Sequence, residues 1–526
     1  MKIRLNTTFA FAMALPGAAL AQQADLPQAG NEWFTAGQTT IQEILDRQPN
    51  TDRARNVILL IADGNGVGTN YATRLFVGQQ GGGLGDDHVL PYEGTAWSTA
   101  LVKTYSTNGQ TPDSAPTATA ANAGIKTKND LINITADVAV GDCAAGLENG
   151  VTTLAEILAE QGKSVGVVST ARITHATPAA VYARTANRDW EDDGEVPEGC
   201  AQLDIAAQLA GQMNAGVIDV AMGGGRRHFI PETVTDGEDQ AGVRKDERNL
   251  PEEITASGGA YAQTQDEFEA IDGATVEGPV LGLFEPSHML YEADRANEPS
   301  LAEMTAKAIE ILGRNEDGFY LAIEAGRVDH ANHAGNLARV VRDGAAFAEA
   351  VAVADEMTDD ADTLIVVTAD HEHAIAFNGY CGRGSDILGL CMQIDEAGTA
   401  ALDAPNTASD GKPYTVAGYL NGAGSVLVEE IPEEGSADTS QPVQPETGEA
   451  EGEAVPVFAG ARPDLTQEEA TDIDYLQQAL IPMSSETHSG EDVAVYAKGP
   501  FAHLFDGTIE QNYLFHVMHH AAFGSE

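Results

Sequence analysis

Three runs of mainly apolar residues, each followed directly by an acidic residue, constrain the fold of this 526-residue chain more than any other feature. Residues 57–62, 319–323 and 364–369 are the runs, and Asp63, Glu324 and Asp370 follow them. Continuous apolar runs of this length are typical of strands buried on both faces of a sheet. Because ligands of open α/β sheets bind outside the carboxyl ends of the strands, the three acids predict a site at one sheet edge.

The rest of the chain alternates between strand and helix patterns. We expect further strands at 165–169, 217–222 and 493–497, and helices at 153–161, 301–312 and 337–357. Apolar stripes at helical spacing in these helices indicate core packing and not cofactor binding. The alternation predicts an α/β protein with a large, mostly parallel sheet.

The pattern breaks at residues 428–457, which are acidic and rich in Pro, Gly, Ser and Thr without periodicity. We interpret this segment as part of an exposed insertion of about 378–460 that interrupts one domain of residues 22–526. Four cysteines allow three pairings. We expect neighbours in the sequence to pair, Cys143 with Cys200 and Cys381 with Cys391.

The N-terminus and the charge indicate where the protein works. Residues 1–21 have a basic start, an apolar centre and a small-residue cleavage site, so we expect a signal peptide and a periplasmic or secreted protein without a membrane span. The formal net charge of −53 disfavours nucleic acid and anionic membranes as partners. Only 9 of the 28 basic residues are lysine, a composition typical of salt-adapted proteins. A calcium-binding or disordered acidic surface fits poorly with 43% hydrophobic residues.

Ser114 lies where an irregular stretch, Thr111-Pro112-Asp113, changes into a run of small residues. This pattern predicts the start of a helix, and backbone N–H groups at such a start favour an anion or an alkoxide. Judged from this stretch alone, an ordinary capping serine is the more frequent explanation. Metal-ligand residues elsewhere make Ser114 a candidate nucleophile.

Acids and histidines gather in three later segments. Asp329 and His333 are four residues apart, so a helix would place them on one face as a zinc pair. Asp370, His371, Glu372 and His373 are consecutive, and only some of them can be ligands. His488 precedes the last apolar strand. Each histidine alone is more often a surface or hydrogen-bonded residue, but together they indicate a metal centre.

At these residues the chain resembles the alkaline phosphatases, over nearly the whole mature sequence. The segment 111–114 is similar to the family's nucleophile segment, 319–335 to its Glu and Asp-x-x-x-His segment, and 486–500 to its last zinc ligand. His175 and His330 indicate the animal-type and marine bacterial branch. The resemblance implies a three-layer α/β/α fold with a small crown-like insertion, and a homodimer in which residues 22–48 form a candidate arm.

The resemblance also implies a site, residue by residue. One Zn²⁺ would be held by Asp329, His333 and His488, and a second by Asp63, Asp370 and His371 with Ser114. One Mg²⁺ would be held by Asp63, Thr177 and Glu324, with His175, His330 and Asp113 as outer groups. Carboxylates and a hydroxyl suit the harder ion, whereas imidazoles suit zinc.

Arg188 matches the family's phosphate-binding arginine, and we rank it above its neighbours Arg172 and Arg184. Without the resemblance, a surface salt bridge would be the default interpretation of this arginine. Phe284, Glu285 and Glu298 resemble the calcium site of the animal-type enzymes, with a further acid expected within 232–238. In so acidic a chain these residues are equally explained as solvated carboxylates, so both interpretations stay open.

The function expected from these residues is hydrolysis of small organic phosphate monoesters through a phosphoserine intermediate, with a broad range of leaving groups. A phosphodiesterase or sulfatase on the same scaffold is the enzymatic alternative. A non-catalytic, cation-binding acidic envelope protein is the alternative from another class.

Overall fold

The computed structural model describes residues 26–429, 458–460 and 462–524. It divides into two compact units, residues 1–49 and 50–526. The described part of the first unit contains helix α2 (Glu32–Asp46), which begins where the Asn31 side chain accepts hydrogen bonds from Trp33 N and Phe34 N. No α2 residue is buried. The expected signal peptide lies outside the described residues.

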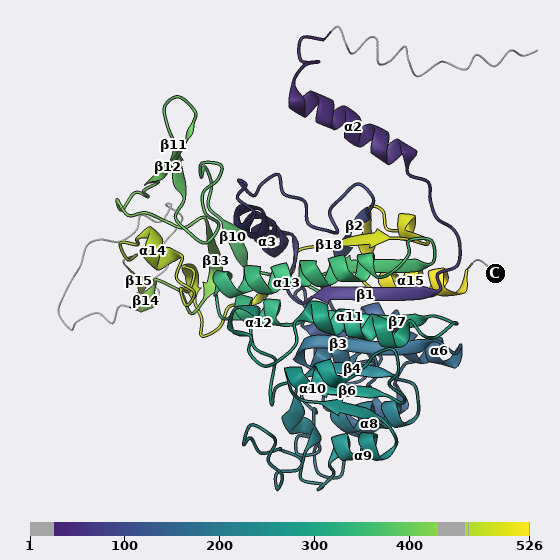
Figure 1. Cartoon of the computed structure of the whole chain (residues 1–526). Helices are drawn as coiled ribbons and strands as arrows, with labels where there is room; N and C mark the ends of the chain where they lie inside the picture. Colours follow the sequence, from purple (N-terminus) through teal and green to yellow (C-terminus); the bar gives the residue numbers. More distant parts are fainter. Residues whose placement is uncertain (1–25, 430–457, 461, 525–526) are drawn as a thin grey trace, which may run out of the picture. The chain divides into compact units, whose positions relative to one another are not determined.

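A ten-stranded sheet forms the centre of the second unit (Figure 1). Its strands in spatial order are β19 (Thr508–Glu510), β2 (Ser98–Lys103), β18 (Val493–Lys498), β8 (Thr363–Thr368), β1 (Asn56–Ala62), β7 (Phe319–Ala325), β3 (Ser164–Arg172), β4 (Val220–Gly224), β6 (Val280–Leu283) and β5 (Ala260–Ala262). Strand β18 is antiparallel to both of its neighbours, and the other pairings are parallel. The sheet is therefore mostly parallel, as predicted.

Both faces of the sheet are covered by helices, so the fold has three layers. All seven residues of β1 are buried, and they alternate between two hydrophobic clusters, Leu59 on one face and Leu60 on the other. The first cluster includes residues of α4 (Ser114–Ala123), α6 (Leu154–Glu160), α7 (Ala176–Ala179), α8 (Ile205–Asn214), α9 (Leu250–Ala256) and α15 (Tyr513–Phe523). The second includes residues of α3 (Val67–Gln80), α10 (Gln265–Ala270), α11 (Leu301–Leu312), α12 (Arg327–His333) and α13 (Leu337–Glu356).

The helix ends follow the capping chemistry of the sequence. Ser300 caps α11, and Glu303 closes a capping box with it. Thr153 caps α6 in the same way through Glu156. The short elements α5 (Cys143–Glu148), η1 (Arg226–Phe229), η2 (Glu292–Asp294) and η3 (Ala502–Leu504) lie in the connections. None of the helices in the described part of the chain is long and apolar enough to cross a membrane.

Small sheets follow β8 in the region of the expected insertion. Strands β10 (Ile375–Phe377), β13 (Ala417–Gly422) and β16 (Ala479–Pro482) form one of them, and β11 (Met392–Ile394) and β12 (Ala400–Pro405) form a hairpin. Strand β14 (Val428–Glu429) pairs with β15 (Phe458–Ala459), and α14 (Gln467–Ala470) follows. Most of the predicted acidic stretch, residues 430–457, lies outside the described residues.

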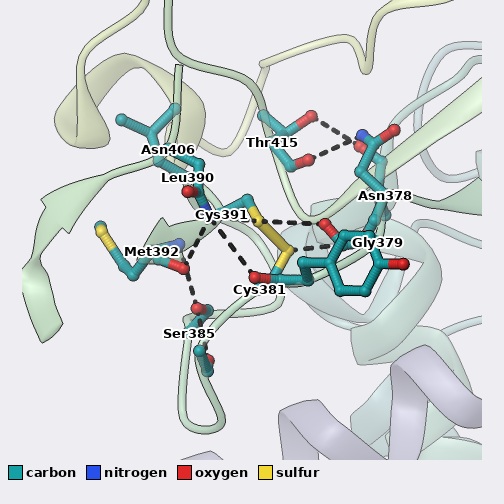
Figure 2. The surroundings of a disulfide bond; sticks show 12 residues. Asn378, Gly379, Cys381, Ser385, Leu390, Cys391, Met392, Asn406 and Thr415 are labelled. Carbon is teal, nitrogen blue, oxygen red and sulfur yellow. Dashed lines mark hydrogen bonds between the residues drawn. A yellow bond between two sulfur atoms is a disulfide. The ribbon is translucent and has the colours of Figure 1, made fainter. Parts of the chain in front are cut away.

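Both predicted disulfides are confirmed. Cys143 bonds Cys200, and Cys381 bonds Cys391. Cys391 N donates to Tyr414 O. Near the second bridge, Asn406 Nδ2 donates to Met392 O (Figure 2), so the loop of residues 381–391 is hydrogen-bonded to its surroundings. The structure describes no free cysteine.

Candidate active site and metal centre

The three predicted strand-end acids meet at one edge of the sheet. Strand β1 pairs in parallel with β7 and β8, so that Ile61 lies opposite both Glu324 and Thr368. Asp63 and Asp370 follow their strands, and Gly64 N donates to Asp370 Oδ1 over 3.0 Å. Glu324 belongs to β7 itself, one residue before its end. Parallel pairing of neighbouring strands is what brings these distant residues together.

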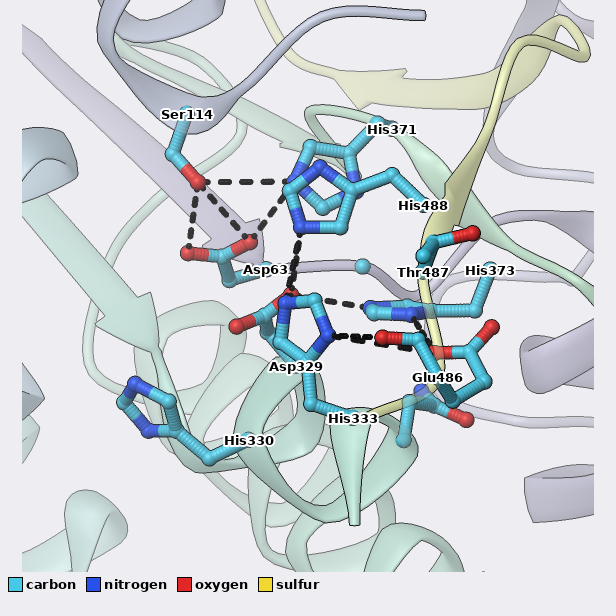
Figure 3. Close-up of polar contacts among 12 residues, drawn as sticks. Asp63, Ser114, Asp329, His330, His333, His371, His373, Glu486, Thr487 and His488 are labelled. Atoms are coloured by element: carbon cyan, nitrogen blue, oxygen red, sulfur yellow. Dashed lines mark hydrogen bonds and ion pairs between the residues drawn. The ribbon is translucent and has the colours of Figure 1, made fainter. Parts of the chain in front are cut away.

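Ser114 is the first residue of α4 and faces this edge (Figure 3). Asp113 caps the helix by accepting from Ala115 N over 2.9 Å. The Ser114 Oγ lies 3.4 and 3.3 Å from the two Asp63 oxygens and 3.4 Å from His371 Nε2. The side chain is almost completely buried. The hydroxyl thus combines a helix N-terminus with a group of potential metal ligands.

Asp329, His333 and His488 form a second group beside the first (Figure 3). Asp329 Oδ1 lies 3.4 Å from His333 Nε2 and 3.2 Å from His488 Nε2, and the two Nε2 atoms are 3.0 Å apart. Each histidine places its Nδ1 near a backbone carbonyl, Glu486 O for His333 and Pro112 O for His488. Donation from Nδ1 to a carbonyl leaves the Nε2 lone pair directed at Asp329, the orientation of metal-bound histidines.

The structure separates the four consecutive residues 370–373 by role. Asp370 and His371 form a group with Asp63, in which ligand atoms lie within 4.8 Å of one another. Glu372 instead accepts from Gly68 N and from Thr69 Oγ1 at the start of α3. These contacts give Glu372 a structural role.

His373 joins the second group, which sequence reasoning left undecided. Its Nε2 lies 2.9 Å from Asp329 Oδ1 and its Nδ1 lies 2.6 Å from Glu486 Oε2. Burial lowers the pKa of His373, but the two carboxylates outweigh burial and raise it to about 10. His373 therefore links Asp329 to Glu486. The sequence contained no signal for Glu486 beyond its closeness to His488.

A third group surrounds the far side of Asp63. Thr177 Oγ1 donates to Asp63 Oδ2 over 3.4 Å, and ligand atoms of Asp63, His175 and Glu324 lie within 4.8 Å of one another. Ser169, which the sequence analysis missed, donates to Glu324 Oε2. Thr177, Glu324 and Asp63 are thus brought together as expected.

The donor sets fit bound cations. Burial, followed by the nearby Asp329 carboxylate, raises the pKa of Asp63 to about 6. Burial and then Asp63 raise the pKa of Asp370 to about 6 and that of Glu324 well above its usual value. Glu324 Oε1 and His371 Nδ1 are buried without a hydrogen-bond partner. Buried carboxylates repel one another unless a cation neutralises them, so metal ions would relieve the main electrostatic cost of this site.

The three candidate arginines have different surroundings. Arg172 donates to Glu191, with Nε 2.8 Å from Oε2, and Arg184 donates to Glu156 Oε1 over 2.9 Å. Arg188 lies beside the site, with Nη2 3.0 Å from His175 Nε2 and Nη1 3.7 Å from Asp113 Oδ1. Arg172 and Arg184 are thus hydrogen-bonded directly to carboxylates, whereas Arg188 has only the longer ion pair with Asp113, which connects it to the start of α4 at Ser114.

His175 and His330 lie next to a third histidine, His288, that sequence reasoning missed. The ring centroids of His288 and His330 are 4.0 Å apart, and those of His175 and His330 are 5.5 Å apart. Arg327 Nη1 lies 3.1 Å from His330 Nδ1. Burial lowers the pKa of His330 to about 3 and lowers that of His175 well below its usual value, so both rings are neutral.

Of the candidate calcium residues, Phe284 and Glu285 follow β6 directly, and Glu298 lies shortly before α11. Glu298 Oε1 accepts from Leu290 N over 2.9 Å, while its Oε2 is buried without a partner. Burial and then the Glu285 carboxylate raise the pKa of Glu298 to about 8. Burial raises the pKa of Glu285, and within the expected range 232–238 both Glu238 and Asp236 raise it further, with the larger effect from Glu238. Arg226 Nη2 lies 2.5 Å from Glu238 Oε2. Phe284 precedes Glu285 directly, so its carbonyl lies near these acids in the chain.

Comparisons with known proteins agree on one family. A model of the alkaline phosphatase family matches residues 54–523. The alkaline phosphatase of Gadus morhua is 38% identical over 516 residues, covering 95% of this chain and 98% of that protein. The tissue-nonspecific isozyme of Homo sapiens is 37% identical over 508 residues, covering 93% and 88%. The crystal structure of Thermus thermophilus alkaline phosphatase superposes with a TM-score of 0.60 at 22% identity, covering 91% and 93%, which supports the fold.

Proposed function

Because the chain belongs to the alkaline phosphatase family and hydrolyses phosphate monoesters, we propose that it does so through a phosphoserine intermediate on Ser114. The observation that carries this proposal is the position of the Ser114 Oγ, 3.3 to 3.4 Å from both Asp63 oxygens and from His371 Nε2. A buried hydroxyl among these groups has few other uses. Attack of its oxygen on phosphorus would expel the leaving alkoxide and form the phosphoserine, which water would then hydrolyse.

Three groups of side chains would hold the metals. We assign one zinc to Asp329, His333 and His488, a second to Asp63, Asp370, His371 and Ser114, and a magnesium to Asp63, Thr177 and Glu324. Their imidazole and carboxylate content supports the two types of ion. When bound, such ions supply positive charge that stabilises alkoxides and phosphoryl oxygens.

The side chains around the metals would hold and orient the phosphate. Arg188 offers two parallel N–H donors to two phosphoryl oxygens. Asp113 positions both partners, since it caps α4 at Ser114 and lies 3.7 Å from Arg188. Recognition would then concentrate on the phosphate group, which explains a broad range of leaving groups among small organic phosphates.

Phosphoenzyme trapping tests the assignment of Ser114. The full-length enzyme, incubated with radiolabelled phosphate at acidic pH and quenched, should carry label on serine, and Ser114→Ala should carry none. Ser257→Ala, in which an exposed serine hydrogen-bonded to Asn214 is replaced, is the matched control and should label normally. Stoichiometric serine labelling of Ser114→Ala would contradict the proposal.

The same preparation separates the rival functions. Hydrolysis of p-nitrophenyl phosphate should exceed that of bis-p-nitrophenyl phosphate and p-nitrophenyl sulfate by orders of magnitude, and chelation should abolish it until zinc and magnesium are restored. A preference for the diester or the sulfate would indicate a phosphodiesterase or a sulfatase. Absence of turnover with all three would indicate a non-catalytic cation-binding protein.

Further features of the protein are proposals on the same basis. Two disulfides support an exported enzyme, periplasmic or secreted. The net charge of −53 supports a salt-adapted one. The unpartnered Glu298 oxygen, with Glu285 and the Phe284 carbonyl, supports a calcium site. A homodimer would use the arm of residues 22–48, whose helix α2 exposes Trp33, Ile41 and Leu45.

A further inference from the structure

A second type of polar cluster lies away from the residues assigned above. Ligand atoms of Asp192, Glu195 and His228 lie within 4.8 Å of one another. Asp192 and Glu195 belong to the loop that follows Arg188, and His228 belongs to η1, the turn after β4. We propose that these three side chains form an additional binding site for a divalent cation of the zinc type. The site is independent of the proposed phosphoserine mechanism.

Geometry and burial support a built site. Asp192 and His228 are 2% and 1% exposed, and Asp192 Oδ2 lies 2.7 Å from His228 Nδ1. The second oxygen of Asp192 accepts from Gly194 N over 2.8 Å, which fixes the carboxylate. Glu195 is exposed at the mouth and is held by Glu191 N, which donates to its Oε2 over 2.9 Å. Two rigid ligands and one adjustable ligand are thus already in place.

The charges of the cluster favour a cation. Within the described part of the chain, no lysine or arginine forms an ion pair with Glu195 or Asp192, and the Asp192 carboxylate lies against the His228 imidazole. One imidazole with two carboxylates matches zinc or manganese better than calcium, which prefers oxygen ligands alone.

The His228 ring is held at both of its nitrogens. Arg227 Nε lies 3.1 Å from Nε2, so Nε2 accepts and Nδ1–H donates to Asp192. A cation at Nδ1 would move the ring proton to Nε2, which would break the hydrogen bond from Arg227 and leave the Glu191 carboxylate, with Oε2 3.6 Å away, to face the Nε2 proton. Arg172 and Thr174 hold that carboxylate in place. A carboxylate behind a metal-bound histidine is the usual outer partner.

The cluster opens to solvent, so a metal could enter and keep water ligands. All three side chains line a cavity of about 360 Å³, together with Arg227, Glu232 and Lys245 at its edge. Three protein ligands with an open position are typical of exchangeable zinc sites. A cation here would join the 189–195 loop, which begins directly after Arg188, to the turn after β4.

Metal analysis of the full-length enzyme tests this site. After equilibration with zinc and desalting, Glu195→Gln and His228→Gln should each retain one zinc ion per chain fewer than the wild type. All three proteins should hydrolyse p-nitrophenyl phosphate at similar rates. Glu232→Gln is the matched control, because it removes an exposed carboxylate of the same cavity that lies outside the cluster. It should retain the wild-type number of zinc ions.

The outcomes are separable from those of the catalytic proposal. If Glu195→Gln retains as much zinc as the wild type, or if Glu232→Gln loses the same equivalent, the three-residue site is wrong. Should His228→Gln fail to fold because its ring is buried, Glu195→Gln decides, since an exposed side chain can be replaced without disturbing the core. Loss of phosphoserine labelling would not affect this result, because zinc is counted directly.

Discussion

Replacement of Arg188 provides a quantitative test of how phosphate is held. A hydrogen bond to a charged group contributes about 1.5–3 kcal/mol, so losing a two-bond fork costs about 3–6 kcal/mol. The Asp113 carboxylate, 3.7 Å away, already compensates part of the guanidinium charge, which favours the lower half of this range. With about 1.4 kcal/mol per tenfold change in rate, we expect Arg188→Ala to lower kcat/KM by roughly 10²- to 10³-fold. Arg188→Lys keeps the positive charge but cannot form two parallel hydrogen bonds to the phosphate, so it should lower kcat/KM about 10- to 100-fold.

The assay is steady-state hydrolysis of p-nitrophenyl phosphate with inhibition by inorganic phosphate measured in parallel. Arg184→Lys is the control, because Arg184 carries the same charge four residues away but is bound to Glu156 and to Val151 O. We expect it to stay within about threefold of the wild type, since it makes no contact with the site. Equal losses in Arg188→Lys and Arg184→Lys, or an unchanged inhibition constant for phosphate in Arg188→Ala, would refute the reasoning.

Three other properties follow from the structure. The Cys143–Cys200 bridge spans 57 residues and the Cys381–Cys391 bridge spans 10. Replacing both cysteines of a bridge with serine should lower the free energy of unfolding by about 4 kcal/mol for the first bridge and about 3 kcal/mol for the second. Loss of the Cys143–Cys200 bridge should therefore lower the midpoint of guanidinium unfolding more. An inverted order would contradict the loop-entropy argument. Burial raises the pKa of Asp343 from 3.8 to about 8, so the folded state retains a proton that the unfolded state loses between these values. The contribution of Asp343 to stability should therefore fall as pH rises from about 4 to 8, by up to about 1.4 kcal/mol per pH unit, and Asp343→Asn should reduce the slope of the unfolding free energy against pH by about that amount in urea unfolding. A slope unchanged in the variant would disprove this reasoning. Finally, 1 M salt reduces the Debye length to about 3 Å, so the melting temperature should rise with salt because the net charge is −53. A melting temperature independent of salt would exclude salt adaptation.

Most of the fold could be predicted because the central strands are apolar on both faces. β1, β7 and β8 coincide with the predicted runs within one or two residues. The strand expected at 217–222 is instead β4, Val220–Gly224, because Val217 N still bonds Gln212 O at the end of α8. Apolar character alone cannot distinguish the last turn of a connection from the first residue of a strand.

The site was predictable where residues lie in a local pattern, and less so elsewhere. Asp329 and His333 share a helix, and Asp370 with His371 follows a strand, so their spacing carried the signal. Ser169, His288 and Glu486 had no such pattern. Each contacts the site through tertiary packing, as when Glu486 reaches His373 across 113 residues. Sequence spacing does not report contacts of that kind.

The order of the strands explains why one residue belongs to two of the proposed metal groups. β1 lies between β8 and β7 in the sheet, so the acid that follows β1 has a strand-end acid on each side, Asp370 on one and Glu324 on the other. Asp63 is therefore the carboxylate that can reach His371 at 3.3 Å and Thr177 at 3.4 Å with its two oxygens. The sequence supplies three equivalent acids, and only the pairing of the strands makes Asp63 the shared one. Ser114 reaches this carboxylate from the start of α4, so the proposed activation of its hydroxyl would depend on the central position of β1 as well as on the helix that carries it.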